Sequence, residues 1–264
     1  SAASDVYKRQ IIMANVIKLR KGLDVNLKGK AAKEEFQVKK PAVYALMPDD
    51  FTGMKPKVVV KENDVVKVGD SLFVDKNHPE IKFVSPVSGR VTMVERGDRR
   101  KVLSVRVEAD AEQQYVDFGK KNVGQMTAQE VKDLLLESGL FGFFRQRPYD
   151  VTANPSDTPK AIFVSAFNSM PLAADFEYVL RGREADFQAG LDALAKMAKT
   201  YLGVSSKQTA TALTAAKNVE INFFDGPAPA GNVGVQINHI SPINKGEVVW
   251  TLGAEEVIFI GHLL

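Results

Sequence analysis

The chain has 264 residues, of which 45% are hydrophobic and 25% charged, and its formal net charge is +3 at pH 7. This length suffices for about two domains, the composition is ordinary for a globular protein, and so small a net charge gives no reason to expect a nucleic-acid partner. The absence of cysteine excludes thiolate-ligated zinc, iron–sulfur clusters, disulfides and cysteine nucleophiles from this chain. No apolar run approaches the roughly 18–20 residues that cross a bilayer, so we expect no transmembrane segment.

The first residues, SAASDVYKRQII, show no pattern that joins them to the rest of the chain. They lack the continuous apolar stretch of a secretory signal, and Met13 opens the next stretch, MANVIKLRKGLD, as an ordinary start. We therefore expect residues 1–12 to be an extraneous leader.

Short β-rich runs separated by turn residues fill residues 41–108. The runs are AVYAL, KVVVK, SLFV, IKFV, GRVTMV and VLSVRVE, and Gly69-Asp70 and Ser88-Gly89 mark tight turns between them. This pattern predicts a β domain over residues 13–112. The segments VKVGDSLFV and SPVSGRV resemble the barrel-sandwich hybrid fold of biotinyl and lipoyl carrier domains.

In carriers of that type an exposed hairpin lysine accepts the prosthetic group, which makes Lys76 the candidate here and Lys82 the second. The segment Asn77-His78-Pro79 follows Lys76, and the distance to Pro86 is longer than in carrier motifs. We therefore favour a structural use of the fold without an attached cofactor. A lipoyl- or biotinyl-type carrier protein is the alternative function.

One short cluster of basic residues follows in the β domain, formed by Arg96, Arg99, Arg100 and Lys101. Basic residues are otherwise scattered along the chain. A solvated turn is the favoured interpretation of such a cluster.

Near residue 126 the spacing of apolar residues changes, from a pattern of short strands to one of alternating helices and strands. Thr127 with Glu130 forms a capping-box signature at the start of TAQEVKDLLLESG. Expected strands are AIFVSA, YLGVSS, VEINFF and EVVWT, and expected helices are READFQAGLDALAKMAKTYL, ATALTAAK and AEEVIFIGHLL. Alternation of this kind predicts a Rossmann-like α/β domain over residues 126–264, with the boundary between Asp110 and Met126.

The stretch SGLFGFFRQRP stands where a nucleotide-binding loop would stand, but bulky residues occupy places that such a loop leaves to bare backbone. Neither G-x-G-x-x-G nor G-x-x-x-x-G-K-[ST] occurs in the chain. Three interpretations stay open: a loop packed on its own domain, a loop that meets a quinone or a neighbouring subunit, and a retained flavin or NADH site. The second would use the aromatic faces and guanidinium donors of Phe141, Phe143, Phe144, Arg145 and Arg147.

Two other features are weaker signals of a site. The loop FFDGPAPAGNVG follows an expected strand, where α/β sheets often bind ligands, but it equally suits a long connection. The histidines His78, His239 and His262 are not at metal-ligand spacing, so we expect no metal site.

Several longer stretches resemble the NqrA family, which supplies one component of the bacterial sodium-translocating NADH:quinone oxidoreductases. They run in the same order from Ile17 to the end of the chain, and related stretches occur in the C subunit of the Rnf complex. The stretches are IKLRKGLDV, DDFTGMKPKVVVKENDVVKVGDSLFVDKNHPEIKFVSPVSGRV, ERGDRRKVLSVRVE, SGLFGFFRQRP, AIFVSAFNSMPLAAD, AGLDAL and FDGPAPAG.

The resemblance implies a peripheral subunit on the cytoplasmic face of the bacterial inner membrane, docked on membrane subunits, chiefly the B subunit. It also implies an association with the quinone-reducing end of a Na⁺-pumping NADH:quinone reductase, and an α/β domain like the complex I flavoprotein subunit. No cofactor is expected on this chain and no turnover from it alone, because FAD, FMN, riboflavin and the 2Fe-2S cluster belong to other subunits of that family. An autonomous flavoenzyme is a third option. The family subunit continues with a ubiquitin-like domain and a helical tail, which we expect to lie beyond residue 264.

Overall fold

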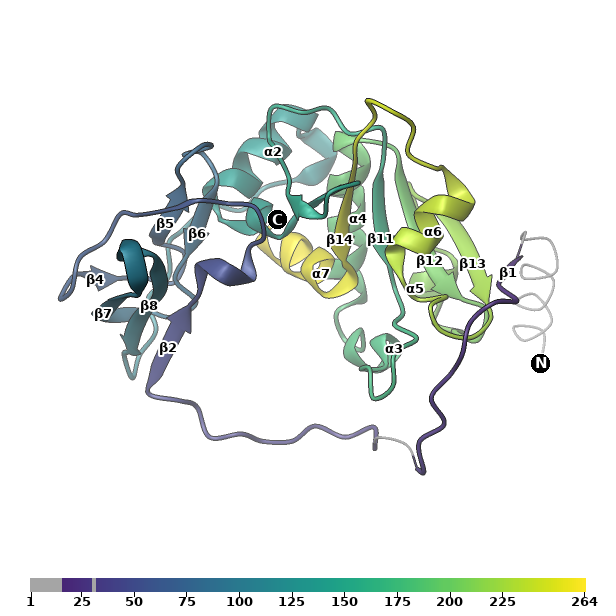
Figure 1. Ribbon diagram of the computed structural model, residues 1–264, viewed down its shortest axis with the longest axis horizontal. Coiled ribbons are helices and arrows are strands. Elements are labelled where there is room, and N and C mark those ends of the chain that lie inside the picture. The colour runs from purple at the N-terminus through teal and green to yellow at the C-terminus, as the bar shows by residue number, and fades with distance from the viewer. Residues whose placement is uncertain (1–15, 30–31) are drawn as a thin grey trace. The chain divides into compact units, whose positions relative to one another are not determined.

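The computed structural model describes residues 16–29 and 32–264, which form two compact units (Figure 1). The α/β unit combines the described residues up to Glu34 with Pro159–Leu264, and the β unit is Glu35–Thr158. The expected leader, residues 1–12, lies outside the described residues.

Two sheets of short antiparallel strands form the first part of the β unit, as predicted. One sheet has the order β2-β8-β7-β4 and the other β3-β5-β6. Phe73 and Phe83 stack in the core with their ring centroids 5.1 Å apart, and Val91 and Val107 of the other sheet are also buried. The strands are β2 (Val43–Leu46), β3 (Pro56–Val58), β4 (Val65–Val66), β5 (Ser71–Asp75), β6 (Lys82–Val84), β7 (Gly89–Arg96) and β8 (Val102–Ala109).

The helix expected after residue 126 is α2 (Ala128–Glu137), and it begins where the capping box predicts. The Glu130 amide donates to Thr127 Oγ1 at 3.2 Å, and the Thr127 amide donates to Glu130 Oε2 at 2.7 Å. The Thr127 amide and hydroxyl both donate to the Glu130 carboxylate, and these two hydrogen bonds hold the pKa of Glu130 below its ordinary value. The chain continues through the short turns η4 (Leu140–Phe143) and the strands β9 (Arg145–Arg147) and β10 (Val151–Thr152).

The compact units are divided at different residues from the predicted domains of 13–112 and 126–264. Helix α2, the loop after it and the β9–β10 hairpin belong to the β unit, because Gly142 packs directly on the ring of Phe83. At the other end, β1 (Val16–Lys18) belongs to the α/β unit, where it pairs with β13. A three-residue strand carries too little periodicity to be assigned from the sequence.

Parallel strands of the α/β unit follow the order β1-β13-β12-β11-β14. In register, Val164 lies between Leu202 and Leu252, and all three are buried. Burial on both faces explains why these strands are continuous apolar runs rather than alternating ones. The strands other than β1 are β11 (Ile162–Ser165), β12 (Thr200–Ser205), β13 (Glu220–Asp225) and β14 (Val249–Gly253).

Helices cover both faces of this sheet (Figure 1). Helix α6 (Val233–Ile240) packs through Ile237 on Phe163 and Tyr201, whereas α4 (Glu184–Met197) and α7 (Ala254–Leu263) pack against each other and contact β12 and β14. The chain moves from β11 outward to β13 and returns to β14 on the other side of β11. Because crossovers between parallel strands are right-handed, this change of direction places α6, in the connection from β13 to β14, on the face opposite to α4. The reversal of strand order with helices on both faces is typical of a Rossmann-like fold, so that prediction is confirmed in this unit.

Two helical predictions in the α/β unit need correction, and one helix was missed. The helix expected to run through KTYL ends at Met197, because Thr200 already starts β12. The helix expected over ATALTAAK is a single turn, α5 (Thr211–Thr214). Helix α6 was not predicted, since it starts directly after a proline–glycine loop, although Asn232 caps it by accepting from the Gly234 amide at 2.8 Å. A further one-turn helix, α3, spans Phe176–Val179.

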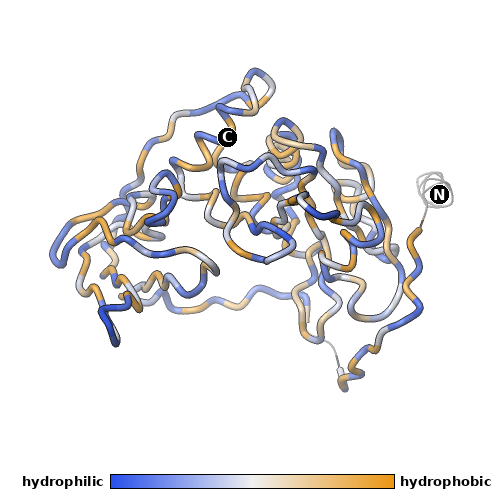
Figure 2. Tube along the Cα trace, turned by 45° about the horizontal axis from the view of Figure 1, so that its top comes forward, coloured by the Kyte–Doolittle hydropathy of each residue, from blue (hydrophilic) through white to orange (hydrophobic). Residues whose placement is uncertain are grey.

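The segment between β1 and β2 has neither helix nor strand in its described residues. It begins anchored, since the Leu23 amide donates to Ala228 O at 3.0 Å. Beyond that point apolar and polar residues alternate (Figure 2). Leu23, Val25 and Leu27 are all exposed.

Candidate functional site

Two aromatic residues of the loop after α2 are buried rather than available to a ligand. Phe141 and Phe144 have no exposed surface, and their rings stack on each other with centroids 5.2 Å apart. The turn η4 between them brings the two rings together. Their faces are therefore occupied by protein, which leaves neither ring free to stack on a quinone in this conformation.

Glycines of the same loop face protein as well. Gly139 has a left-handed φ of 80°, and a Cβ there would lie 2.7 Å from the side chain of Val84. A Cβ at Gly142 would lie 2.8 Å from the ring of Phe83. A phosphate-binding loop needs glycines so that its amides can approach phosphate oxygens, whereas here they let the loop approach the β strands.

The other predicted site residues reach the surface. Phe143 is 40% exposed, and its ring meets the edge of Phe51 at 6.0 Å. The side chains of Arg145 and Arg147 are 29% and 24% exposed. The structure thus separates Phe143, Arg145 and Arg147 from the two buried phenylalanines.

Asp150 holds both arginines by one carboxylate oxygen. Arg145 Nε donates to Asp150 Oδ1 at 3.2 Å, and its other nitrogens donate to Asp150 O and to Thr52 Oγ1. Arg147 Nε lies 3.2 Å from the same Oδ1, but among the described residues this buried nitrogen has no hydrogen-bond partner. Arg147 is thus the less firmly held of the two guanidinium groups.

In the α/β unit a glutamine fills the carboxyl edge of the sheet, where Rossmann-like folds bind their ligands. Gln236 of α6 is buried, and its Nε2 donates to Ser165 Oγ at 2.9 Å and to Ala230 O at 3.2 Å. Its Oε1 lies so close to β12 that a Cβ at Gly203 would be 2.2 Å from it. Gln208 closes the same edge by donating to Ala166 O at 2.8 Å. No sequence motif indicated either glutamine.

The loop at residues 223–234 behaves as a connection rather than as a ligand cradle. The Gly231 amide donates to Ser169 Oγ at 3.0 Å, and the Ala228 amide donates to Asp24 Oδ1 at 2.8 Å. At Gly226 a Cβ would lie 2.5 Å from Leu19 O. Its glycines therefore permit close contacts with neighbouring backbone of the same unit.

Glu256 stands in the first turn of α7 at this carboxyl edge, with one unpaired oxygen. Its Oε2 is buried and has no hydrogen-bond partner among the described residues. Burial raises the pKa of Glu256 above its ordinary value, and the nearby charge of Glu255 adds to the effect. Folding therefore favours the protonated carboxyl group.

We expect Glu256→Gln to stabilise the protein at neutral pH by roughly 1 kcal/mol, the lower end of the cost of an unsatisfied buried polar group. A raised folded-state pKa contributes stability below the unfolded pKa and loses it as the pH rises through the folded value. The gain should therefore vanish at acid pH. Urea unfolding from acid to neutral pH measures the gain. Glu255→Gln, at an exposed position in the same helical turn, should give only the smaller gain that follows from removing its charge near Glu256. An equal gain in both variants would contradict the assignment to burial.

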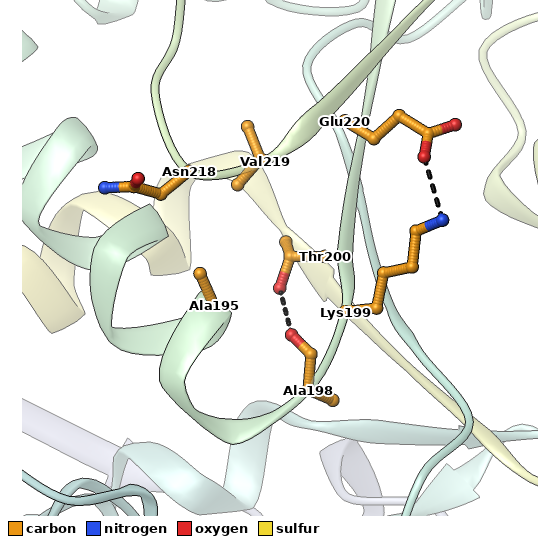
Figure 3. A pocket seen from close by; sticks show the side chains of 7 residues that line it. All are labelled: Ala195, Ala198, Lys199, Thr200, Asn218, Val219 and Glu220. Atoms are coloured by element: carbon orange, nitrogen blue, oxygen red, sulfur yellow. Dashed lines mark hydrogen bonds and ion pairs between the residues drawn. The ribbon is translucent and has the colours of Figure 1, made fainter.

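A pocket of about 390 Å³ lies at the opposite, amino-terminal edge of β12 and β13 (Figure 3). Lys199 Nζ pairs with Glu220 Oε2 at 2.9 Å and lies 4.8 Å from the centroid of the Tyr201 ring. Hydrogen bonds with Tyr201 and Glu220 raise the pKa of Lys199, which keeps the amine charged and unsuited to nucleophilic attack. The other lining residues are Ala195, Ala198, Thr200, Asn218 and Val219.

Other predicted features are separate from these sites. Lys76 is exposed in the β5–β6 connection, where its amide donates to Lys55 O at 2.7 Å, and Lys82 lies in β6. Within residues 16–29 and 32–264, no three histidine, aspartate or glutamate side chains gather closely enough to hold a metal ion. In the same ranges, no helix has the length and hydrophobicity to span a bilayer.

Comparison with known families agrees with both parts of this architecture. Residues 17–110 match the NqrA N-terminal barrel-sandwich hybrid domain, and residues 126–264 match the NqrA second alpha/beta domain. The chain belongs to the NqrA family. The matched ranges confirm the predicted fold classes.

Curated relatives of NqrA, each named as the A subunit of a Na(+)-translocating NADH-quinone reductase, match along nearly the whole chain. The relative from Yersinia pseudotuberculosis serotype O:1b (strain IP 31758) is 35% identical over 254 residues, which are 94% of this chain and 56% of the relative. The relatives from Pseudomonas aeruginosa (strain UCBPP-PA14) and Vibrio vulnificus (strain YJ016) are 34% and 36% identical over 251 residues, with the same coverage of both chains. The chain thus spans little more than half the length of these relatives.

Proposed function

We propose that this chain is the part of an NqrA protein that docks on the membrane subunits of a Na⁺-translocating NADH:quinone reductase and lies at its quinone-reducing end. It works at the cytoplasmic face of the membrane, and the B subunit is its chief partner. Electrons travel through the FAD, FMN, riboflavin and 2Fe-2S groups of other subunits, and this chain holds none of them.

The observation that carries this proposal is that side chains of the protein itself occupy the space around the loop after α2. The stacked rings of Phe141 and Phe144, together with Gly142 against Phe83, leave no bare backbone for a phosphate. A nucleotide or flavin would have to displace buried aromatic rings. Gln236 over Gly203 supports the same conclusion independently in the α/β unit.

The exposed end of the loop supplies the surface that we assign to the quinone or to the partner. Phe143 offers an accessible ring edge that continues an aromatic cluster with Phe51 and Phe83, whose centroids are 4.4 Å apart. Arg147 is available to donate to a carbonyl oxygen or a carboxylate. Phe143 and Arg147 together suit a flat ring with a carbonyl oxygen, or an apolar partner surface with a hydrogen-bond acceptor beside it.

Two measurements test the proposal. A short-chain ubiquinone is titrated into the chain by calorimetry, and the other subunits, purified in detergent, are captured on it. We expect Phe143→Ala and Arg147→Ala to weaken one of these interactions by about tenfold, equivalent to roughly 1.4 kcal/mol. Phe259→Ala, at a surface phenylalanine of α7, is the matched control and should change neither. Binding that survives both changes would place the site elsewhere, and no binding in either measurement would refute the proposal.

A further inference from the structure

The tip of the β7–β8 hairpin carries the basic cluster noted in the sequence, and all of its charged side chains are exposed. The hairpin closes through two backbone hydrogen bonds, from the Gly97 amide to Lys101 O at 2.8 Å and from the Lys101 amide to Asp98 O at 3.0 Å. We use "hairpin tip" for residues 96–101.

Two arginines of the hairpin tip occupy backbone conformations that disfavour them. Arg99 and Arg100 both have positive φ, at 53° and 61°, between the hydrogen-bonded residues Asp98 and Lys101. A two-residue turn with positive φ at both central positions favours Asn-Gly, because long side chains crowd the backbone there. Turn geometry therefore does not explain why arginines stand at these two positions.

Charge at the hairpin tip is positive and only partly neutralised. Lys101 pairs with Asp49 at 2.7 Å, whereas Arg99 and Arg100 form no ion pair with the described residues. Of the nearby carboxylates, Glu95 Oε2 accepts from Arg106 at 2.6 Å, and the charge of Asp98 offsets only part of the positive charge of the hairpin tip. Two guanidinium groups thus stand on the hairpin without an ion pair to any described residue.

Apolar side chains flank the charges on the same hairpin. Leu103 is 37% exposed and packs beside Gly97, where a Cβ would lie 3.1 Å from its side chain. Met93, on the facing strand, is 41% exposed. Basic residues beside exposed aliphatic ones suit the headgroup region of a bilayer, where phosphates meet acyl chains.

We propose that the hairpin tip is an electrostatic contact with the anionic phospholipid surface of a membrane. The inference rests on the proposed function, which brings the chain to a membrane complex, and it adds a direct contact between this chain and lipid. A few basic residues give weak, salt-sensitive attraction, so the contact orients a protein that its partners already hold.

Vesicle sedimentation of the full chain at low salt tests the contact, with phosphatidylglycerol/phosphatidylethanolamine vesicles compared with phosphatidylcholine vesicles. We expect binding to the anionic vesicles alone. The double variant Arg99→Asn with Arg100→Asn should bind them roughly 30-fold more weakly, since each basic residue at the surface contributes about fivefold. Asparagine tolerates the left-handed conformation, so the variant keeps the turn and should melt no lower than the wild type.

Two further variants separate charge at this place from charge in general. The double variant Arg99→Lys with Arg100→Lys should bind anionic vesicles as well as the wild type does, because attraction to phosphate needs only the positive charge. Lys120→Ala with Lys121→Ala removes two exposed charges elsewhere in the β unit and should leave binding unchanged. Equal binding to both vesicle types, or an equal loss in this control, would overturn the proposal.

A protein partner for the hairpin tip would give a different pattern. The asparagine variant would then weaken association with the other subunits in detergent and leave vesicle binding as it was, which would also overturn the lipid contact. The proposed function fails separately, since it is measured by Phe143 and Arg147 variants without any bilayer.

Discussion

Replacing Phe144 by alanine should destabilise the protein by about 3–5 kcal/mol, the cost of removing a fully buried phenylalanine from a packed core. The side chain has no exposed surface and stacks on Phe141, so the cavity it leaves would be lined by an equally buried ring. Urea unfolding followed by circular dichroism measures the change, and Phe141→Ala should have a similar effect. A loss below about 1 kcal/mol would show that the loop is not packed in this way.

Phe143→Ala is the matched control, because it removes the same side chain from the same loop. Phe143 is 40% exposed and touches Phe51 only by its edge, so we expect a loss of about 1 kcal/mol or less. The contrast also decides which variant can test quinone binding. A Phe144 variant would lose binding by unfolding, whereas a Phe143 variant changes the surface and leaves the core intact.

Much of the fold could be predicted because it depends on local patterns. Thr127 and Glu130 fixed the start of α2 through a capping box that involves only neighbouring residues. The apolar runs of β11, β12 and β14 indicated buried parallel strands before their order was known. Turns at Gly69 and Ser88-Gly89 separated the short strands of the β unit for the same local reason.

The site could not be predicted to the same depth, because its properties depend on contacts between distant residues. Phe141, Phe143 and Phe144 look alike in the sequence, and only their packing shows that two are buried and one reaches the surface. Gln236 approaches Gly203 across more than thirty residues of chain, and no pattern within α6 indicates that contact. Likewise, the left-handed conformation of Arg99 follows from how the hairpin closes.

The second large effect is expected where α4 and α7 cross in the α/β unit. A Cβ at Gly190 would lie 2.0 Å from Val257 O, and a Cβ at Gly261 would lie 1.7 Å from Asp186 O. Gly190 and Asp186 are one helical turn apart on α4, as Val257 and Gly261 are on α7. The two helices therefore run antiparallel and touch backbone to backbone at both glycines.

Gly190→Ala should destabilise the protein by roughly 2 kcal/mol or more, because the new methyl group meets a main-chain carbonyl that cannot turn away. Overpacking a tight contact costs about 1–3 kcal/mol and occasionally more. Alanine is also favoured over glycine by about 1 kcal/mol in a helix, so the measured loss is what remains after that gain. Ala185→Gly, at an exposed position of the same helix, measures the effect of helix propensity alone.

The two variants together distinguish close packing from simple helix propensity. If α4 and α7 were separated by ordinary side chains, Gly190→Ala would stabilise the protein by about as much as Ala185→Gly destabilises it. Loss of stability in both variants, measured by urea unfolding, is the result that the contact with Val257 O requires. Gly261→Ala should repeat the loss from the other helix. The double variant should lose less than the sum of the single changes, since one separation of the helices relieves both clashes.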